Sequence, residues 1–181
     1  YVKRAHDEGW RSRAAFKLIE LGDKDKLFRP GMSVVDLGSA PGSWTQVLRQ
    51  RLGPGAAIVA IDLLPMAPVA GVTFLQADFR EDDGLAQLEN ALDGRKADLV
   101  VSDLSPNLSG VGAADQARSV HLGDLALEFC KAWLQPGGDL VVKAFQGEGF
   151  ADFRHAMEAH FAKVYVRKPH ASRDRSREVY V

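Results

Sequence analysis

The sequence predicts an α/β fold: a mostly parallel sheet of seven strands with helices on both faces and an antiparallel strand at its C-terminal edge. Short β-rich segments alternate with segments whose apolar residues recur at helical spacing, a pattern typical of parallel strands joined by helices. A glycine-rich turn over residues 38–42 follows the first strand and leads into a helix, as in Rossmann-like proteins. The last two strand segments are joined by a polar loop without a helix, so they can pair only as antiparallel neighbours.

The expected elements follow one another along the whole chain. A basic helix comes first, at residues 12–21. The strand segments, rich in Val, Ile and Leu, are 33–37, 57–61, 72–76, 97–103, 139–144, 163–168 and 178–181. Apolar residues at helical spacing cover 43–52, 83–92, 114–134 and 149–160. Pro-Gly pairs at 30–31, 54–55 and 136–137 indicate turns.

Length and composition favour one domain. The 181 residues are 46% hydrophobic and 26% charged, which suits a single domain with a substantial core. We divide it into the basic helix 12–21, a cofactor-binding core 31–145, and a C-terminal helix with an antiparallel hairpin, 149–181. No apolar run approaches the roughly 20 residues that span a bilayer, and the first residues lack a signal-peptide pattern. With one cysteine, Cys130, no internal disulfide can form. We expect a cytoplasmic monomer without a membrane segment.

Basic residues gather at the two ends of the chain, although the net charge is only −1. Residues 1–29 hold eight Lys/Arg against five Asp/Glu (+3), and residues 163–181 hold six against two (+4). Guanidinium groups suit phosphate oxygens, so a nucleic-acid surface is one interpretation and two solvated ends are the other. The candidate RNA contacts are Arg11, Arg13, Arg167, Lys168, Arg173, Arg175 and Arg177.

A nucleoside cofactor pocket is indicated at the carboxyl edge of the sheet. Gly38 and Gly42 allow the backbone of the turn to approach a ligand closely. Three strands end in Asp62, Asp78 and Asp103, and Asp62 stands 20 residues after Gly42, where a carboxylate can accept bonds from ribose hydroxyls. NAD would fit that acid too. The further carboxylates would repel a pyrophosphate and suit a cationic centre, which favours S-adenosyl-L-methionine.

Trp44, in the first turn after Gly42, has two interpretations: it lies in the core or against the cofactor. No metal site is expected, because the five histidines show no metal-ligand spacing.

Four charged residues far apart in the chain each lie at the edge of an apolar segment: Lys17, Asp103, Lys143 and Glu178. Such edges are where an α/β scaffold presents side chains to a ligand, and a charge inside a strand would be costly to bury without a partner. A reaction centre beside the cofactor pocket is one interpretation, and a structural network of ion pairs is the other.

Seven segments of the chain resemble the FtsJ/RrmJ (RlmE) family of ribosomal RNA ribose 2′-O-methyltransferases. They are RSRAAFKLIE, PGMSVVDLGSAPGSWTQ, IDLLPM, FLQADFR, SDLSPNLSG, VVKAFQGEGF and VRKPHASRDRSREVYV. The resemblance runs from Tyr1 to Val181 and implies the Rossmann-like S-adenosylmethionine-dependent methyltransferase fold. Ser43 departs from it, since many relatives carry a second glycine there.

The resemblance also implies site residues and a substrate. The family's Lys-Asp-Lys-Glu tetrad falls on Lys17, Asp103, Lys143 and Glu178. Its cofactor contacts fall on Gly42, Trp44, Asp62, Asp78 and Asp103. The implied substrate is a uridine in the peptidyl-transferase-region loop of large-subunit ribosomal RNA, with the assembled large ribosomal subunit as partner.

The chemistry leaves two roles for Lys143. A ribose hydroxyl becomes a good nucleophile only as its proton leaves, so the site needs a proton acceptor or a cation beside the developing alkoxide. A lysine amine is a base only where its surroundings hold it neutral; otherwise it acts as the cation. Alternative functions are methylation of a messenger cap or another RNA, a nicotinamide oxidoreductase, and a non-catalytic RNA-binding ribosome assembly factor.

Overall fold

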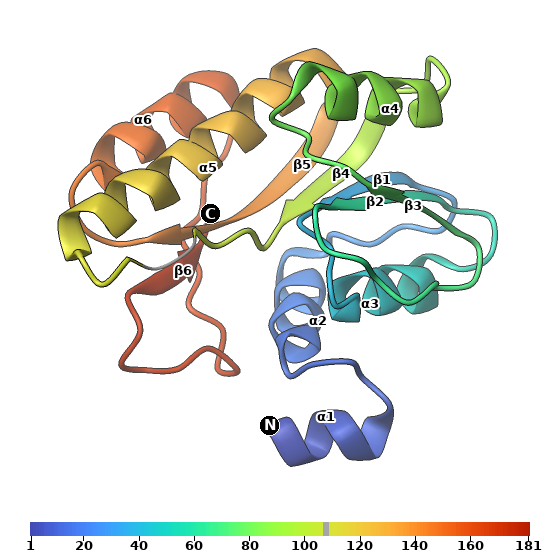
Figure 1. Ribbon diagram of the computed structural model, residues 1–181, viewed down its shortest axis with the longest axis horizontal. Helices are drawn as coiled ribbons and strands as arrows, with labels where there is room; N and C mark the ends of the chain where they lie inside the picture. The colour runs from blue at the N-terminus through green and yellow to red at the C-terminus, as the bar shows by residue number, and fades with distance from the viewer. Residues whose placement is uncertain (107–108) are drawn as a thin grey trace.

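The computed structural model of the protein describes residues 1–106 and 109–181, and within them a single sheet of six strands runs through the molecule (Figure 1). Asn107 and Leu108, part of the SDLSPNLSG segment, lie outside the described residues. The strands are β1 (Ser33–Leu37), β2 (Ala57–Asp62), β3 (Val72–Gln76), β4 (Ala97–Ser102), β5 (Leu134–Phe145) and β6 (Glu178–Tyr180). The helices are α1 (Val2–Glu8), α2 (Ala14–Asp25), α3 (Ser43–Leu52), α4 (Asp82–Leu92), α5 (Gly112–Trp133) and α6 (Phe150–His160).

The order of strands in the sheet is β3-β2-β1-β4-β5-β6. The first five are parallel to their neighbours, and β6 is antiparallel to β5. Parallel pairing requires a crossover between strands. The helices α3, α4 and α5 lie in three of these connections, whereas β2 is joined to β3 by residues 63–71 without a helix. The α/β class, the mostly parallel sheet and the antiparallel C-terminal strand are therefore confirmed.

The expectation of a seventh strand at residues 163–168 is wrong. This segment meets β6 at one antiparallel bridge only, Arg167 with Tyr180, whose two backbone hydrogen bonds are 2.7 and 2.8 Å long. The ladder cannot continue, because Pro169 has no backbone N–H to donate. The carbonyl of Glu178 instead accepts a 2.6 Å hydrogen bond from the Lys168 side chain.

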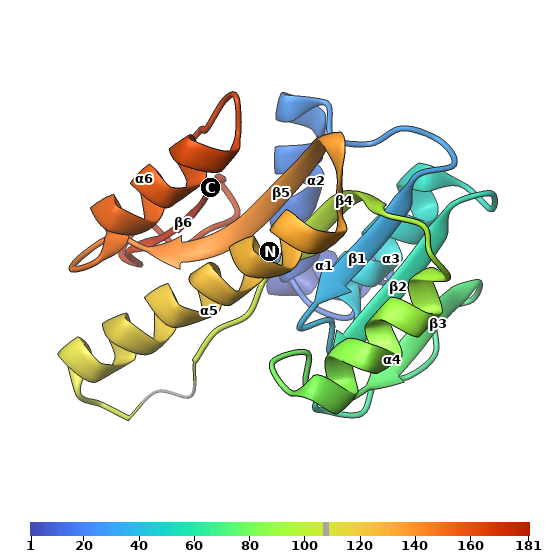
Figure 2. The same ribbon diagram turned by 90° about the horizontal axis from the view of Figure 1, so that it is seen from above.

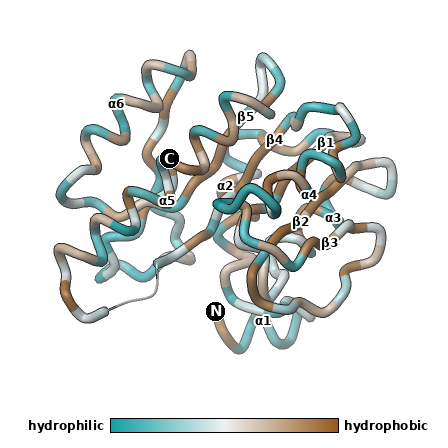
Figure 3. The backbone as a smooth tube through the Cα atoms, turned by 45° about the horizontal axis from the view of Figure 1, so that its top comes forward, coloured by the Kyte–Doolittle hydropathy of each residue, from teal (hydrophilic) through white to brown (hydrophobic). Residues whose placement is uncertain are grey.

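Helices cover both faces of the sheet, as the alternation predicts. Two apolar clusters separate these layers. Leu18 of α2 and Leu48 of α3 are fully buried against one face, whereas Leu88 of α4, Leu127 of α5 and Phe153 of α6 are buried against the other. Figure 2 shows α4 and α5 lying on the same side of the strands, and Figure 3 shows hydrophobic residues concentrated along the central strands. Because the central strands are parallel, the polar residues at their carboxyl ends lie along the same side of the sheet.

Local boundaries differ from the sequence expectation at both ends of the fold. The first helix of the chain is α1, which was not expected, and α2 extends to Asp25 rather than ending near residue 21. The Pro136-Gly137 pair lies inside β5, where the pairing shifts between Leu134 and Asp139. This turn is therefore a bulge within a strand rather than a boundary before one.

Candidate active site

The four charged residues of the tetrad, Lys17, Asp103, Lys143 and Glu178, lie in one cluster. Lys17 Nζ is 2.8 Å from Glu178 Oε1. Lys143 Nζ is 3.0 Å from Asp103 Oδ1 and 3.6 Å from Glu178 Oε2. Each of the four side chains is at most 17% exposed. Glu178 thus bridges two lysines, and Lys143 lies between two carboxylates, so every charge in the cluster has an opposite partner.

One helix and three neighbouring strands of the sheet position these side chains. Lys17 comes from α2, while Lys143 lies near the carboxyl end of β5 and Glu178 opens β6. Asp103 directly follows β4, the strand that pairs with β5. Since β4 and β5 are parallel, their carboxyl ends meet at the same edge of the sheet.

Tyr180 completes the cluster, and the sequence analysis missed it. Its hydroxyl donates to Asp103 Oδ1 at 2.6 Å, and the same oxygen lies 3.2 Å from Glu178 Oε1. Its ring packs against Trp44 with ring centroids 5.6 Å apart. Side chains two residues apart on a strand share a face, so the position of Tyr180 relative to Glu178 was the signal that could have identified it.

Burial and nearby charge act in opposite directions on these acids. Burial favours the neutral form of Glu178, but the charge of Lys143 and the hydrogen bond and charge of Lys17 outweigh it and hold the pKa of Glu178 below its usual value. For Tyr180, burial and then the charges of Asp103 and Glu178 raise the pKa well above 10. Glu178 is therefore an anion at neutral pH, and Tyr180 is a hydrogen-bond donor.

A cavity of about 710 Å³ adjoins the cluster, and four of the six expected cofactor contacts line it. Gly38, Asp62, Asp78 and Asp103 all line it. Gly38 has a φ of 74°, and a Cβ at this position would lie 2.3 Å from the side chain of Leu104. The turn therefore requires glycine here. Asp103 belongs to both the cavity and the tetrad, so the two candidate sites are continuous.

The two other acids of the cavity are held in different ways. Asp62 accepts hydrogen bonds of 2.9 Å from the backbone amides of Ala40 and Leu64, one on each oxygen. Each oxygen keeps a lone pair for a ligand. Asp78 forms a bidentate pair with Arg80 at 2.8 and 2.7 Å, and this hydrogen bonding lowers its pKa.

Two expected cofactor contacts lie beside the cavity rather than on its lining. The Trp44 side chain is buried in the core, and its indole N–H donates to the carbonyl of Ala14 at 2.8 Å. Gly42 is the N-cap of α3 with a φ of 115°. The structure thus gives Trp44 the core position that the sequence left as one of two interpretations.

A buried acid below the turn was not expected as a site residue. Asp36, near the end of β1, is 1% exposed. Thr45 Oγ1 donates to its Oδ2 at 2.7 Å, while its Oδ1 has no hydrogen-bond partner among the described residues. Burial is the main reason that the pKa of Asp36 rises to about 7; the Thr45 hydrogen bond opposes the rise, and the charges of Asp103 and Asp62 add to it.

The candidate RNA contacts divide into two groups. Three make bonds within the chain: Arg11 donates to three backbone carbonyls, Arg167 pairs with Asp25, and Lys168 donates to the carbonyls of Ser176 and Glu178. The other four make no side-chain hydrogen bond or ion pair among residues 1–106 and 109–181. They are Arg13, which is partly exposed, and the exposed Arg173, Arg175 and Arg177.

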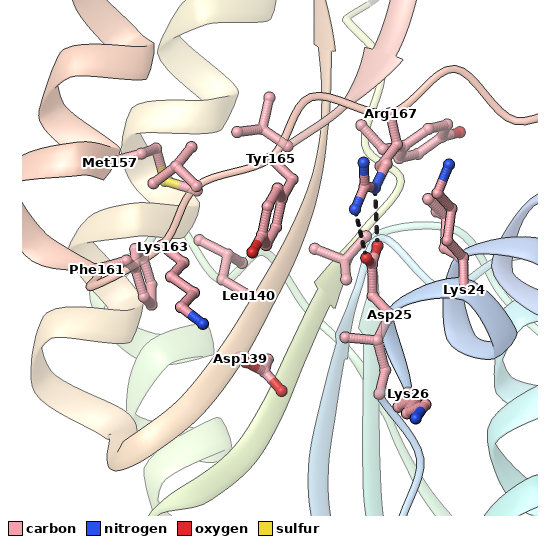
Figure 4. A pocket seen from close by; sticks show the side chains of 16 residues that line it. Lys24, Asp25, Lys26, Asp139, Leu140, Met157, Phe161, Lys163, Tyr165 and Arg167 are labelled. Atoms are coloured by element: carbon pink, nitrogen blue, oxygen red, sulfur yellow. Dashed lines mark hydrogen bonds and ion pairs between the residues drawn. The ribbon is translucent and has the colours of Figure 1, made fainter.

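A second cavity, of about 430 Å³, lies beside the middle of β5 and shares no lining residue with the acid-lined cavity. Arg167 crosses its wall to bind Asp25 with hydrogen bonds of 2.7 and 3.2 Å (Figure 4). Lys163 and Asp139 also line it. Arg167 therefore ties the 161–169 segment to the end of α2.

Residues 1–106 and 109–181 contain neither a metal-binding cluster nor a membrane-spanning helix. No group of three or more His, Cys, Asp or Glu side chains in this part of the chain is arranged to hold a metal ion. None of the described helices combines the length and apolar character needed to cross a membrane.

Comparison with known proteins assigns a family to this geometry. Residues 10–181 match the family model described as FtsJ-like methyltransferase. Curated relatives named ribosomal RNA large subunit methyltransferase E include one from Azoarcus sp. (strain BH72), 60% identical, and one from Nitrosomonas eutropha, 54% identical; each match covers 100% of this chain and 88% of the relative. A Plasmodium falciparum protein assigned as a ribosomal RNA methyltransferase has a crystal structure that superposes with a TM-score of 0.82 at 28% identity, covering 94% of this chain and 95% of that one.

Proposed function

Since this chain belongs to the FtsJ-like methyltransferase family, we propose that it transfers a methyl group from S-adenosylmethionine to a ribose 2′-hydroxyl of large-subunit ribosomal RNA. The relatives that share more than half of its residues are named for large-subunit ribosomal RNA methylation. One observation carries the proposal: Asp103 both lines the acid-rich cavity and binds Lys143 at 3.0 Å. A cofactor pocket thus opens onto a paired lysine.

The donor set of the cavity fits S-adenosylmethionine. Its carboxylates suit a cationic ligand that carries no phosphate. Asp62, with a free lone pair on each oxygen, would hold the ribose hydroxyls, and the turn at Gly38 would allow close approach of the nucleoside. When bound, S-adenosylmethionine supplies a methyl group activated by its sulfonium.

Lys143 faces the substrate hydroxyl in this proposal, and we assign it the role of a cation. Asp103 and Glu178 contact its amine at 3.0 and 3.6 Å, an arrangement that holds a charged ammonium group in place. The ammonium group stabilises the negative charge that develops on the 2′-oxygen as its proton leaves to water. Lys17 and Tyr180 fix the bridging carboxylates and thereby the position of Lys143.

We assign RNA binding to the arginines that make no side-chain hydrogen bond or ion pair within the described part of the chain. Arg173, Arg175 and Arg177 occupy the loop that leads into Glu178, and Arg13 precedes the helix that carries Lys17. Phosphate contacts on both sides of the tetrad would orient a ribose within a folded RNA. We propose a uridine of the peptidyl-transferase-region loop as the target nucleotide. We propose the assembled large subunit as the substrate, since residues 30–162 carry the remaining charge of −8 and would repel naked RNA.

The test is a methyl-transfer assay with S-adenosylmethionine labelled in its methyl group. The substrates are large ribosomal subunits that lack this modification, the same RNA without protein, and a capped oligonucleotide. We expect one 2′-O-methyluridine in the large-subunit RNA by mass mapping, with subunits preferred over naked RNA. Methylation of a base, transfer to the capped oligonucleotide alone, or no transfer to any RNA would contradict the proposal; the last would favour a non-catalytic assembly factor.

A further inference from the structure

We infer that Arg11 is a positioning residue for the cofactor cavity: its guanidinium group ties together the two loops from which the cavity binds its ligand. The loops are the glycine turn, residues 38–42, and the loop of residues 63–71 that follows β2. The inference rests on the proposed function, because it takes S-adenosylmethionine as the ligand of this cavity. It gives Arg11 a role different from the phosphate contact that the sequence suggests.

The contacts of Arg11 carry the inference. Nη1 donates to the carbonyls of Pro41 at 3.0 Å and Ala67 at 2.6 Å, and Nη2 donates to the carbonyl of Pro68 at 2.8 Å. One planar, charged group therefore binds both loops, and its charge strengthens each hydrogen bond. The space is closely filled, since a Cβ at Gly42 would lie 2.5 Å from Nη1.

Asp62 ties the same two loops at a second point. Its carboxylate accepts the amide of Ala40 in the glycine turn and the amide of Leu64 in the following loop, each at 2.9 Å. Residues 63–71 contain no helix or strand, so their position depends on such bonds rather than on a backbone ladder. Because Asp62, at the end of β2, is the residue proposed to hold the ribose, a shift of either loop would change the hydrogen bonds that orient its carboxylate.

The backbone of Arg11 is itself anchored on α3. The Arg11 amide donates to Gln46 Oε1 at 2.9 Å, and Gln46 Nε2 donates to the carbonyl of Gly9 at 3.2 Å. The hydroxyls of Ser12 and Ser43 are 2.8 Å apart. The segment that carries Arg11 is therefore fixed relative to the helix that begins at the glycine turn, and its guanidinium group is preorganised for the two loops.

The test compares Arg11→Ala and Arg11→Lys with Arg13→Ala as the matched control. Arg13 is two residues away and makes no side-chain hydrogen bond to the described part of the chain. We expect Arg11→Ala to weaken binding of S-adenosylhomocysteine, measured by calorimetry, at least tenfold. The Kd of Arg11→Lys should lie between those of the wild type and Arg11→Ala, because an ammonium group lacks the forked donors of a guanidinium group. Arg13→Ala should keep the wild-type Kd within twofold. If Arg11→Ala fails to fold, judged by thermal unfolding, Arg11→Lys carries the comparison.

A second measurement needs no ligand. In the free protein, hydrogen exchange of the amides in residues 63–71 should be faster in the Arg11 variants than in the wild type, with α4 unchanged. Wild-type cofactor affinity and unchanged exchange in a folded Arg11 variant would overturn the inference. So would a weakened affinity for ribosomal RNA with an unchanged cofactor Kd, since Arg11 would then be a phosphate contact. Failure of the wild type to bind S-adenosylhomocysteine would overturn the proposed function itself.

Discussion

Lys17 Nζ and Glu178 Oε1 are 2.8 Å apart although 161 residues separate them in the chain. The other oxygen of Glu178 is 3.6 Å from Lys143, so one carboxylate connects the helix α2, the strand β5 and the last strand β6. A cluster of this kind requires the two ends of the chain to pack together, because α2 and β6 each contribute a member. The charged side chains of the cluster are nearly buried, so removal of one of them leaves an oppositely charged side chain buried without a partner.

Lys143→Ala should reduce methyl transfer by about a thousandfold or more, since the group beside the 2′-oxygen is lost. Cofactor affinity should stay within a few-fold of wild type. Lys143→Arg distinguishes the two roles: a permanent cation should retain measurable activity if charge stabilisation is the function. Single-turnover rates check this, with Lys131→Ala, an exposed lysine of α5, as control. An arginine variant as inactive as the alanine variant would favour the general-base role.

Asp62→Ala should weaken cofactor binding first, because two ribose hydroxyls lose a charged acceptor, a cost of about 1.5 to 3 kcal/mol. The amides of Ala40 and Leu64 also lose their partner. Calorimetry with S-adenosylhomocysteine measures the effect, and Asp83→Ala on the exposed side of α4 is the control. An unchanged Kd would place the ribose elsewhere.

Tyr180→Phe should lower kcat about tenfold while the ring keeps its packing against Trp44. The lost hydroxyl donates to Asp103 at 2.6 Å and lies 3.2 Å from Glu178, and a neutral donor to a charged acceptor contributes roughly 1.5 kcal/mol or more. Because the pKa of Tyr180 is raised well above 10, the phenol stays protonated from pH 6 to 9. The variant should therefore change the height of the pH–rate profile and not its shape. The control is Tyr165→Phe, an exposed tyrosine; equal effects in both variants would remove Tyr180 from the site.

Asp36→Asn should make the free energy of unfolding less dependent on pH. In the folded protein the pKa of Asp36 is raised from 3.8 to about 7, chiefly by burial, so the folded state holds this proton over a range in which the unfolded state has lost it. The stabilisation is complete below about pH 4 and is lost as the pH rises towards 7. At about 1.4 kcal/mol for each pH unit, the loss is at most on the order of 4 kcal/mol.

Urea unfolding at pH 5 and pH 8 measures this difference. The asparagine variant should gain stability relative to wild type at pH 8. The difference between the two free energies of unfolding should be smaller at pH 5. Asp7→Asn, an exposed position in α1, should leave the pH dependence as it is in the wild type. If the free energy of unfolding of Asp36→Asn changes with pH as steeply as that of the wild type, another group is responsible for the pH dependence.

Arg173→Glu combined with Arg175→Glu should raise the KM for large ribosomal subunits and flatten its salt dependence, because fewer phosphate counterions are released on binding. Cofactor affinity and thermal stability should hardly change, since both side chains are exposed. Steady-state rates over a salt series check this, with Arg95→Glu combined with Arg154→Glu as a charge-matched control outside the loop. If the KM depends on salt equally in the two double variants, the loop has no special role in binding RNA.

The alternation of strands and helices, the turn between Gly38 and Gly42, and the acids at the strand ends were all available from the sequence. These features are local, because each depends on a short period or on the residue types within one turn. The family motifs identified the tetrad for the same reason. What local patterns cannot supply is the pairing of side chains that lie far apart, since that depends on strand register and on the packing of the layers.

The tertiary structure therefore decided four points. It showed Tyr180 between Asp103 and Glu178, because β6 pairs with β5 in a register that turns its ring inward. It placed Trp44 in the core by a hydrogen bond to a helix 30 residues earlier, and it ended the sheet at six strands, since Pro169 cannot donate to the ladder. It directed Arg11 to carbonyls of two loops more than 25 residues away. For Tyr180, Trp44 and Arg11, a contact between residues far apart in the chain set a position that no local pattern determines.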